Sequence, residues 1–145
     1  MTELLTRTQP TSTTPRAAYG GQITGIMLAA FALSTAHTIY AWLAGIQDPG
    51  FTVTTPITWI FYAVAFTVSV LAQREQRWAQ WVVTGFLALT LAIGIFYYPT
   101  TFGPRQQTVF GWFENDVYLG LLTVAFYLSI QRLRRVILVP RAPLI

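Results

Sequence analysis

Long apolar runs separated by short polar stretches dominate the middle of this chain. Each run is close to the 20 or so residues that a helix needs to cross the hydrocarbon core of a membrane. The pattern predicts spans at about 22–45, 56–73, 78–98 and 112–133. We therefore expect an all-α fold, an integral membrane four-helix bundle that occupies residues 17–135.

Turn residues and prolines mark the ends of these runs. Thr55 followed by Pro56 is typical of an N-cap and a first helical position. The polar residues 73–77 leave room only for a tight hairpin between the second and third spans, and Pro99 is expected to end the third span. The Asp-Pro-Gly sequence at 48–50 predicts a turn in the first loop.

The two ends of the chain differ from its middle. Residues 1–16 are rich in Thr, Ser and Pro and predict a disordered tail, and residues 136–145 form a second short tail. A cleaved signal peptide is the alternative for the first run, because an apolar stretch at 23–33 precedes small residues at 34–36. The apolar run continues to Leu43, beyond the usual length of such a stretch, which favours a retained span.

Composition supports a membrane protein. The chain is 54% hydrophobic and 10% charged, whereas soluble domains carry about 25% charged residues. All nine basic residues are arginine, which we interpret as the codon bias of a GC-rich bacterial genome. Four spans place both termini on one side, together with Arg7, Arg16, Arg74, Arg77, Arg132, Arg134, Arg135 and Arg141.

The distribution of arginine sets the expected orientation. Only Arg105 falls on the opposite side, so the positive-inside rule predicts that both tails are cytoplasmic and that the protein lies in a bacterial inner membrane. Tryptophans are expected at both interfaces: Trp42, Trp59 and Trp112 outside, Trp78 and Trp81 inside. The arginines expected to anchor the topology and attract anionic lipid are Arg74, Arg77, Arg132, Arg134 and Arg135.

Small residues at helical spacing are candidates for helix packing, because close approach and van der Waals contact drive helix association in lipid. The candidates are Gly21, Gly25, Ala29, Ala32 and Ala36 in the first span and Gly120 in the fourth. We expect them to pack inside one bundle. The alternative is a dimer face on the first span.

One polar cluster is a candidate functional site. It comprises His37, Tyr40, Tyr97, Tyr98, Glu114, Asn115, Asp116 and Tyr118. His37, the chain's only histidine, lies inside the first span, where ionisable groups often mark function. From the helical rise His37 should lie roughly 6 Å deeper than Asp116, so that contact needs helix tilt or a bridging water.

A structural role is the simpler interpretation of these residues. Glu114 and Asp116 in a first helical turn complement the helix dipole, and Asn115 can act as a cap. His37 can equally well bond a hydroxyl group or a backbone carbonyl.

Several classes of chemistry are not expected. The absence of Cys excludes disulfides, thiolate metal sites and the redox cysteines of vitamin K epoxide reductase-like proteins. The first span lacks the acidic residue that small multidrug transporters carry there. A haem would have His37 with only Met1 and Met27 as alternative ligands, and the acidic residues show no metal-binding spacing. We expect no cofactor, no metal and no nucleic-acid partner.

Three functions remain open. The leading hypothesis is a non-enzymatic protein that binds a partner or serves as an accessory or assembly subunit. The first alternative is an oligomeric channel or small-solute transporter that uses His37, Glu114 and Asp116. The second is a membrane enzyme or metal site on the same cluster. The expected partners are the lipid bilayer and either another membrane protein or further copies of the chain.

Overall fold

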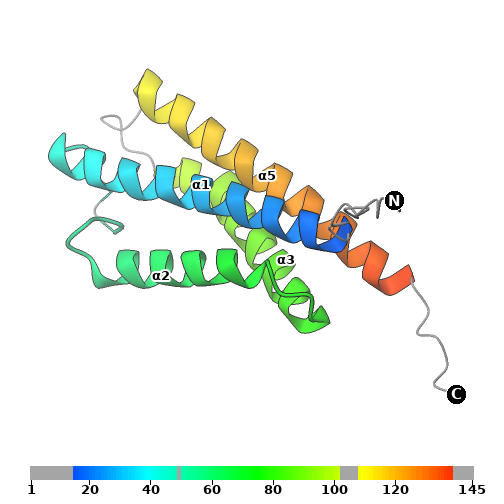
Figure 1. Ribbon diagram of the computed structural model, residues 1–145. Helices are drawn as coiled ribbons and strands as arrows, with labels where there is room; N and C mark the ends of the chain where they lie inside the picture. Colours follow the sequence, from blue (N-terminus) through cyan, green and yellow to red (C-terminus); the bar gives the residue numbers. More distant parts are fainter. Residues whose placement is uncertain (1–14, 49, 102–107, 139–145) are drawn as a thin grey trace, which may run out of the picture.

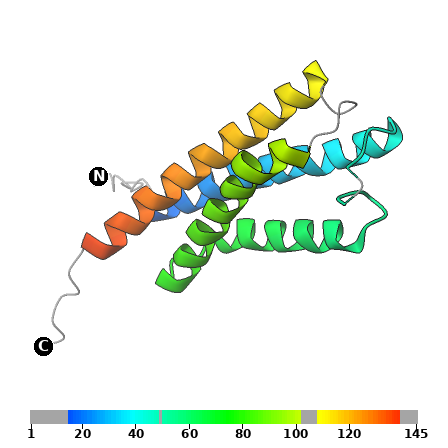
Figure 2. The ribbon, with the colours of Figure 1, turned by 180° about the vertical axis from the view of Figure 1, so that it is seen from behind.

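The computed structural model describes residues 15–48, 50–101 and 108–138, with side chains for all of these except 15–18 and 136–138. Within that part of the chain the elements are α1 (Pro15–Leu43), α2 (Pro56–Leu71), α3 (Arg77–Ala92), the π-helix η1 (Ile93–Tyr97), α4 (Tyr98–Thr101) and α5 (Val109–Leu138). No strand is present among these residues, which confirms the all-α prediction. The four long helices run alternately up and down, and α1 packs against both α5 and α2 (Figures 1 and 2).

The helices correspond to the four predicted runs, but their bounds differ. α1 begins at Pro15, inside the predicted amino-terminal tail, and α5 continues to Leu138, inside the predicted carboxy-terminal tail. Residues 1–14 and 139–145 lie outside the described part, so the predicted disorder is untested there. α2 begins as predicted, with Thr55 at the N-cap position and Pro56 in the first turn.

The prediction that Pro99 ends the third helix is wrong. α3 continues through η1 into α4, so that the helical path reaches Thr101. A proline ring in a regular helix clashes with the carbonyl four residues earlier. The π-helix immediately before Pro99 shifts this register, and the Tyr98 N–H bonds the carbonyl of Ile93 five residues back. The wider turn thus accommodates the proline without breaking the helix.

Phe31 forms the centre of the core. Its side chain is 0% exposed, and it contacts one aromatic ring from each of the other long helices: Phe61 of α2, Phe86 of α3 and Tyr118 of α5. The ring centroids lie 5.9–6.0 Å from that of Phe31, within the favourable range for aromatic pairs. Fully buried aliphatic side chains surround this group: Ile23, Met27, Val83, Leu87 and Leu122.

Short polar side chains join the helices between these apolar layers. Thr24 of α1 donates to the carbonyl of Ser69 in α2 at 2.9 Å. The hydroxyls of Thr84 in α3 and Ser129 in α5 lie 2.6 Å apart, and all of these residues are buried. Such hydrogen bonds satisfy polar groups that would otherwise be buried without a partner.

Arg132 of α5 closes one end of the bundle. Arg132 is 4% exposed, and its guanidinium donates to the carbonyls of Ala72 and Arg74, just after the end of α2. A cation at this position offsets the partial negative charge of a helix carboxy-terminus. Gly20 permits the contact, because a Cβ there would lie 3.1 Å from the Ala72 carbonyl oxygen and 3.3 Å from the guanidinium.

The expectation that the small residues pack inside the bundle is wrong. Gly21, Gly25, Ala29, Ala32, Ala36 and Gly120 are all exposed. A Cβ added at any of the three glycines would meet nothing within 4 Å. The buried stripe of α1 is the opposite one, where larger residues such as Ile23, Met27 and Phe31 fill the interior. The small residues therefore form an unoccupied strip along α1, which we call the small-residue face.

Charge separates the two ends of the bundle. Asp48, Glu114 and Asp116 lie where α1 ends and α5 begins, which we call the acidic end. At the other end, the arginine end, α2 meets α3 and α5 finishes, near Arg74, Arg77, Arg132, Arg134 and Arg135.

Two helical segments are long and apolar enough to cross a membrane, by length and composition: Tyr19–Leu43 and Arg77–Thr101. α2 is strongly apolar, but its 16 residues extend only about 24 Å. α5 is longer, but charged residues near both of its ends lower its hydropathy.

Phe31→Ala should destabilise the protein by on the order of 3 kcal/mol, because it removes three aromatic contacts and leaves a cavity that the helices cannot fully close. Reversible denaturation followed by circular dichroism measures the change. Phe96→Ala is the matched control, since Phe96 is 77% exposed, and it should have less than a third of this effect. Equal effects would contradict the central role of Phe31.

Arg132→Met should destabilise the protein by about 2 kcal/mol, because the buried Ala72 carbonyl and the part-buried Arg74 carbonyl after α2 lose a charged donor. Arg134→Met removes an exposed arginine from the same helix end and should change stability by under about 0.5 kcal/mol. Thermal unfolding of both variants in one detergent gives the comparison. A larger loss in the Arg134 variant would overturn this assignment.

Candidate functional site

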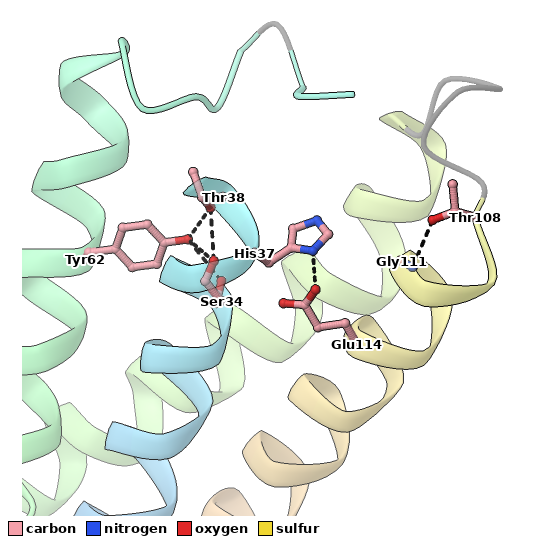
Figure 3. Close-up of polar contacts among 7 residues, drawn as sticks. All are labelled: Ser34, His37, Thr38, Tyr62, Thr108, Gly111 and Glu114. Carbon is pink, nitrogen blue, oxygen red and sulfur yellow. Dashed lines mark hydrogen bonds and ion pairs between the residues drawn. The ribbon is translucent and has the colours of Figure 1, made fainter. Parts of the chain in front are cut away.

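A paired histidine and glutamate join α1 to α5 near the acidic end. His37 Nδ1 bonds Glu114 Oε2 across the interface (Figure 3). The glutamate is 6% exposed, and the side chain of the histidine is 23% exposed. A buried carboxylate is costly unless it is paired, so this contact stabilises Glu114 and fixes the ring of His37.

Helix geometry explains why Glu114, and not Asp116, reaches His37. The inward side of α5 carries Gly111, Glu114, Leu122, Ala125, Ser129 and Arg132, at spacings of three to four residues or their multiples. Asp116 is two residues from Glu114 and therefore points about 200° away around the helix. It is exposed. The expected depths along the helix axes favoured a pairing of His37 with Asp116, whereas the partner is Glu114. Depth along an axis does not give the direction in which a side chain points.

A second polar group lies beside this pair on α1 and α2. The Tyr62 hydroxyl of α2 is 2.6 Å from the Thr38 hydroxyl and donates to the carbonyl of Ser34 at 2.9 Å. Thr38 also donates to the Ser34 carbonyl, at 3.1 Å. These bonds satisfy a buried tyrosine and hold the same stretch of α1 that carries His37 (Figure 3).

A small cavity opens next to His37. Its volume is about 30 Å³, enough for about two water molecules. α1, the loop that follows it, α4 and the start of α5 all contribute to its wall. The lining residues are His37, Thr38, Tyr40, Ala41, Ile46, Asp48, Phe51, Tyr98, Thr108 and Gly111.

The structure brings together part of the predicted cluster. His37, Tyr40 and Tyr98 line the cavity, and Glu114 bonds the ring of His37. Tyr118 packs against Phe31 in the core, and Asn115 is half-buried on α5. Tyr97 and Asp116 are exposed and lie outside the cavity wall.

The sequence interpretation missed Asp48 and the Tyr62 group. Asp48 was assigned only to a turn; there its carboxylate accepts the Gly50 N–H at 2.7 Å, and it also faces the cavity. The alternating direction of the helices was the available signal, because it places this loop at the same end as the start of α5. Nothing in the spacing of Tyr62 distinguished it from the other aromatic residues of its span.

The apolar core separates this site from the arginine end. Phe31, Met27, Leu87 and Leu122 are each 0% exposed and fill the centre between the two polar regions. The interior of a single chain is therefore closely packed halfway between the acidic end and the arginine end. This packing disfavours passage of ions or solutes through one chain. Among the described residues, no group of three His, Cys, Asp or Glu side chains is arranged to hold a metal ion.

The His37–Glu114 contact can be measured by a double-mutant cycle. His37→Ala and Glu114→Ala should each destabilise the protein, and their effects should be non-additive by about 2 kcal/mol, because either change removes the same contact. Asp116→Ala is the control, and it should add independently to His37→Ala. Additive effects of His37→Ala and Glu114→Ala would show that the pair contributes no coupling energy.

No protein-family model, curated protein or solved structure matches this chain.

Proposed function

We propose that this chain is a four-span integral membrane protein of a bacterial inner membrane, with both termini in the cytoplasm. It acts as a non-enzymatic subunit that binds a partner helix within the bilayer. The observation that carries the proposal is that all four long helices expose large apolar side chains.

Exposed apolar side chains occur on every long helix, for example Ile39 of α1, Ile60 of α2, Leu89 of α3 and Val124 of α5. Monomeric soluble proteins rarely expose contiguous apolar surface on this scale. Lipid acyl chains cover such a surface without cost, and the adjoining faces remain open to other helices.

The direction of the four long helices supports four membrane spans, although only two segments have the required length and hydropathy. α1 and the α3–α4 path have the length to cross the bilayer. α2 runs from the acidic end to the arginine end, and α5 does the same. If α1 and the α3–α4 path cross the bilayer, α2 and α5 cross it as well, because they run between the same two ends of the bundle.

Tryptophan and arginine positions are consistent with this orientation. Trp42, Trp59 and Trp112 are exposed at the acidic end, and Trp78 and Trp81 at the arginine end, as two interfacial belts require. The positive-inside rule assigns the arginine end to the cytoplasm.

The small-residue face of α1 is the proposed binding surface. It is exposed and has no contact with the rest of the bundle at Gly21 or Gly25, so a second helix can approach its backbone closely. A second copy of this chain is the partner that fits best, because two identical flat strips match each other around a two-fold axis.

A second candidate function is small-solute binding at the acidic end. The specific observation in its favour is the cavity beside the His37–Glu114 pair. This replaces the predicted use of Asp116, which is turned away from the cavity.

Cysteine labelling tests the orientation cleanly, because the chain has no native cysteine. Thr54→Cys, in the loop at the acidic end, should react with a membrane-impermeant maleimide in intact cells. Gln76→Cys, in the turn at the arginine end, should react only after the membrane is opened. The reverse pattern would invert the topology, and equal labelling of both in intact cells would contradict a four-span arrangement.

Gly25→Leu should weaken self-association at least tenfold, because the new side chain keeps the two backbones apart. Gly85→Leu is the matched control, since Gly85 is an exposed helical glycine with no neighbour within 4 Å, on α3. Energy transfer between labelled chains in bilayers measures the equilibrium. A wild-type chain that remains monomeric, or a control equal to Gly25→Leu, contradicts binding through this face.

A further inference from the structure

The cavity at the acidic end presents hydrogen-bond acceptors to any occupant. Glu114, when ionised, accepts a hydrogen bond from the Nδ1–H of His37, so a neutral His37 has its lone pair on Nε2. Figure 3 shows this second ring nitrogen on the side of the ring away from Glu114. Asp48 adds a carboxylate, of which the Gly50 N–H uses one of about four acceptor positions.

The charge around the cavity is negative. Asp48 lines it, Glu114 lies behind His37, and the lining residues that the structure describes include no arginine. α1 ends at Leu43 and α5 begins at Val109, so a negative and a positive helix end both lie near the cavity and oppose each other. The described carboxylates at the cavity therefore favour a cation over an anion as its occupant.

Aromatic side chains complete the wall. Tyr40, Phe51 and Tyr98 all line the cavity. The face of an aromatic ring is electron-rich and attracts cations. The combination of a carboxylate, an imidazole acceptor and aromatic faces distinguishes this cavity from a simple cluster of acidic residues.

We infer that this cavity binds one small cation with N–H donors, namely ammonium or a short primary alkylammonium ion. The cation donates to the Asp48 carboxylate and to His37 Nε2, while Tyr40 packs against it. Ammonium is close to water in size, and the cavity holds about two waters. A metal ion is a poorer fit, since the described residues offer no set of three acidic or imidazole ligands.

The inference deepens the second candidate function, solute binding, and is independent of association through α1. It depends on the proposed topology only for the side from which the cation enters. Glu114 is here a positioning residue, because it orients His37 and lies behind it.

The test uses the purified full-length chain in lipid nanodiscs. Ammonium chloride and methylammonium chloride should raise the thermal unfolding midpoint in a saturable way. Sodium chloride and tetramethylammonium chloride at the same ionic strength should not, because sodium has no N–H donors and tetramethylammonium is too large and also lacks them. Equal shifts with all four salts, or no saturable shift with ammonium, would overturn the inference.

Asp48→Asn should weaken ammonium binding at least tenfold, because it removes the charge while keeping an oxygen for the Gly50 N–H. Asp116→Asn removes an exposed charge at the same end and should leave the affinity within twofold of wild type. An unchanged affinity in Asp48→Asn excludes this site. If that variant does not fold, the comparison of ammonium with tetramethylammonium on the wild-type chain still tests whether the cavity binds ammonium.

The two proposals fail separately. Gly25→Leu should leave ammonium binding unchanged, since the small-residue face lies on the outward side of α1. A protein that self-associates but shows no ammonium-specific stabilisation loses only the cation site. A monomeric protein that binds ammonium loses only the partner interface.

Discussion

The packing of α1 against α5 and α2, with the Phe31 ring of α1 also reaching Phe86 of α3, is the constraint on which the remaining structure depends. One fully buried ring contacts an aromatic side chain from each neighbour, so the rotation of α1 about its axis is fixed. That rotation turns the larger residues inward and leaves Gly21 and Gly25 outside. The interior and the small-residue face are two consequences of the same packing.

The pairing of His37 with Glu114 follows from this arrangement. With α1 and α5 in contact along their lengths, the inward positions at the acidic end meet, and His37 finds Glu114 as its partner there. At the arginine end Arg132 has the corresponding role towards the carbonyls after α2. The bundle thus has an apolar, closely packed centre between two polar ends.

Much of the fold could be predicted from the sequence, and less of the site. The helical class, the four runs and the start of α2 at Thr55 and Pro56 followed from apolar patterning and capping residues. The end of the third helix did not, because the π-helix before Pro99 depends on local register. Of the candidate cluster, His37, Tyr40 and Tyr98 meet at the cavity, whereas the contribution of Asp48 required the folded loop.

The sequence by itself determined the elements and the ends at which charges gather, because hydrophobic period and proline, threonine and arginine positions act locally. Only the tertiary structure decided which side of each helix faces inward. Small residues pack equally well against a neighbour within the chain or in another, so Gly21 to Ala36 could not be assigned from spacing. Likewise, Glu114 and Asp116 differ by two residues in sequence but by more than half a turn in direction.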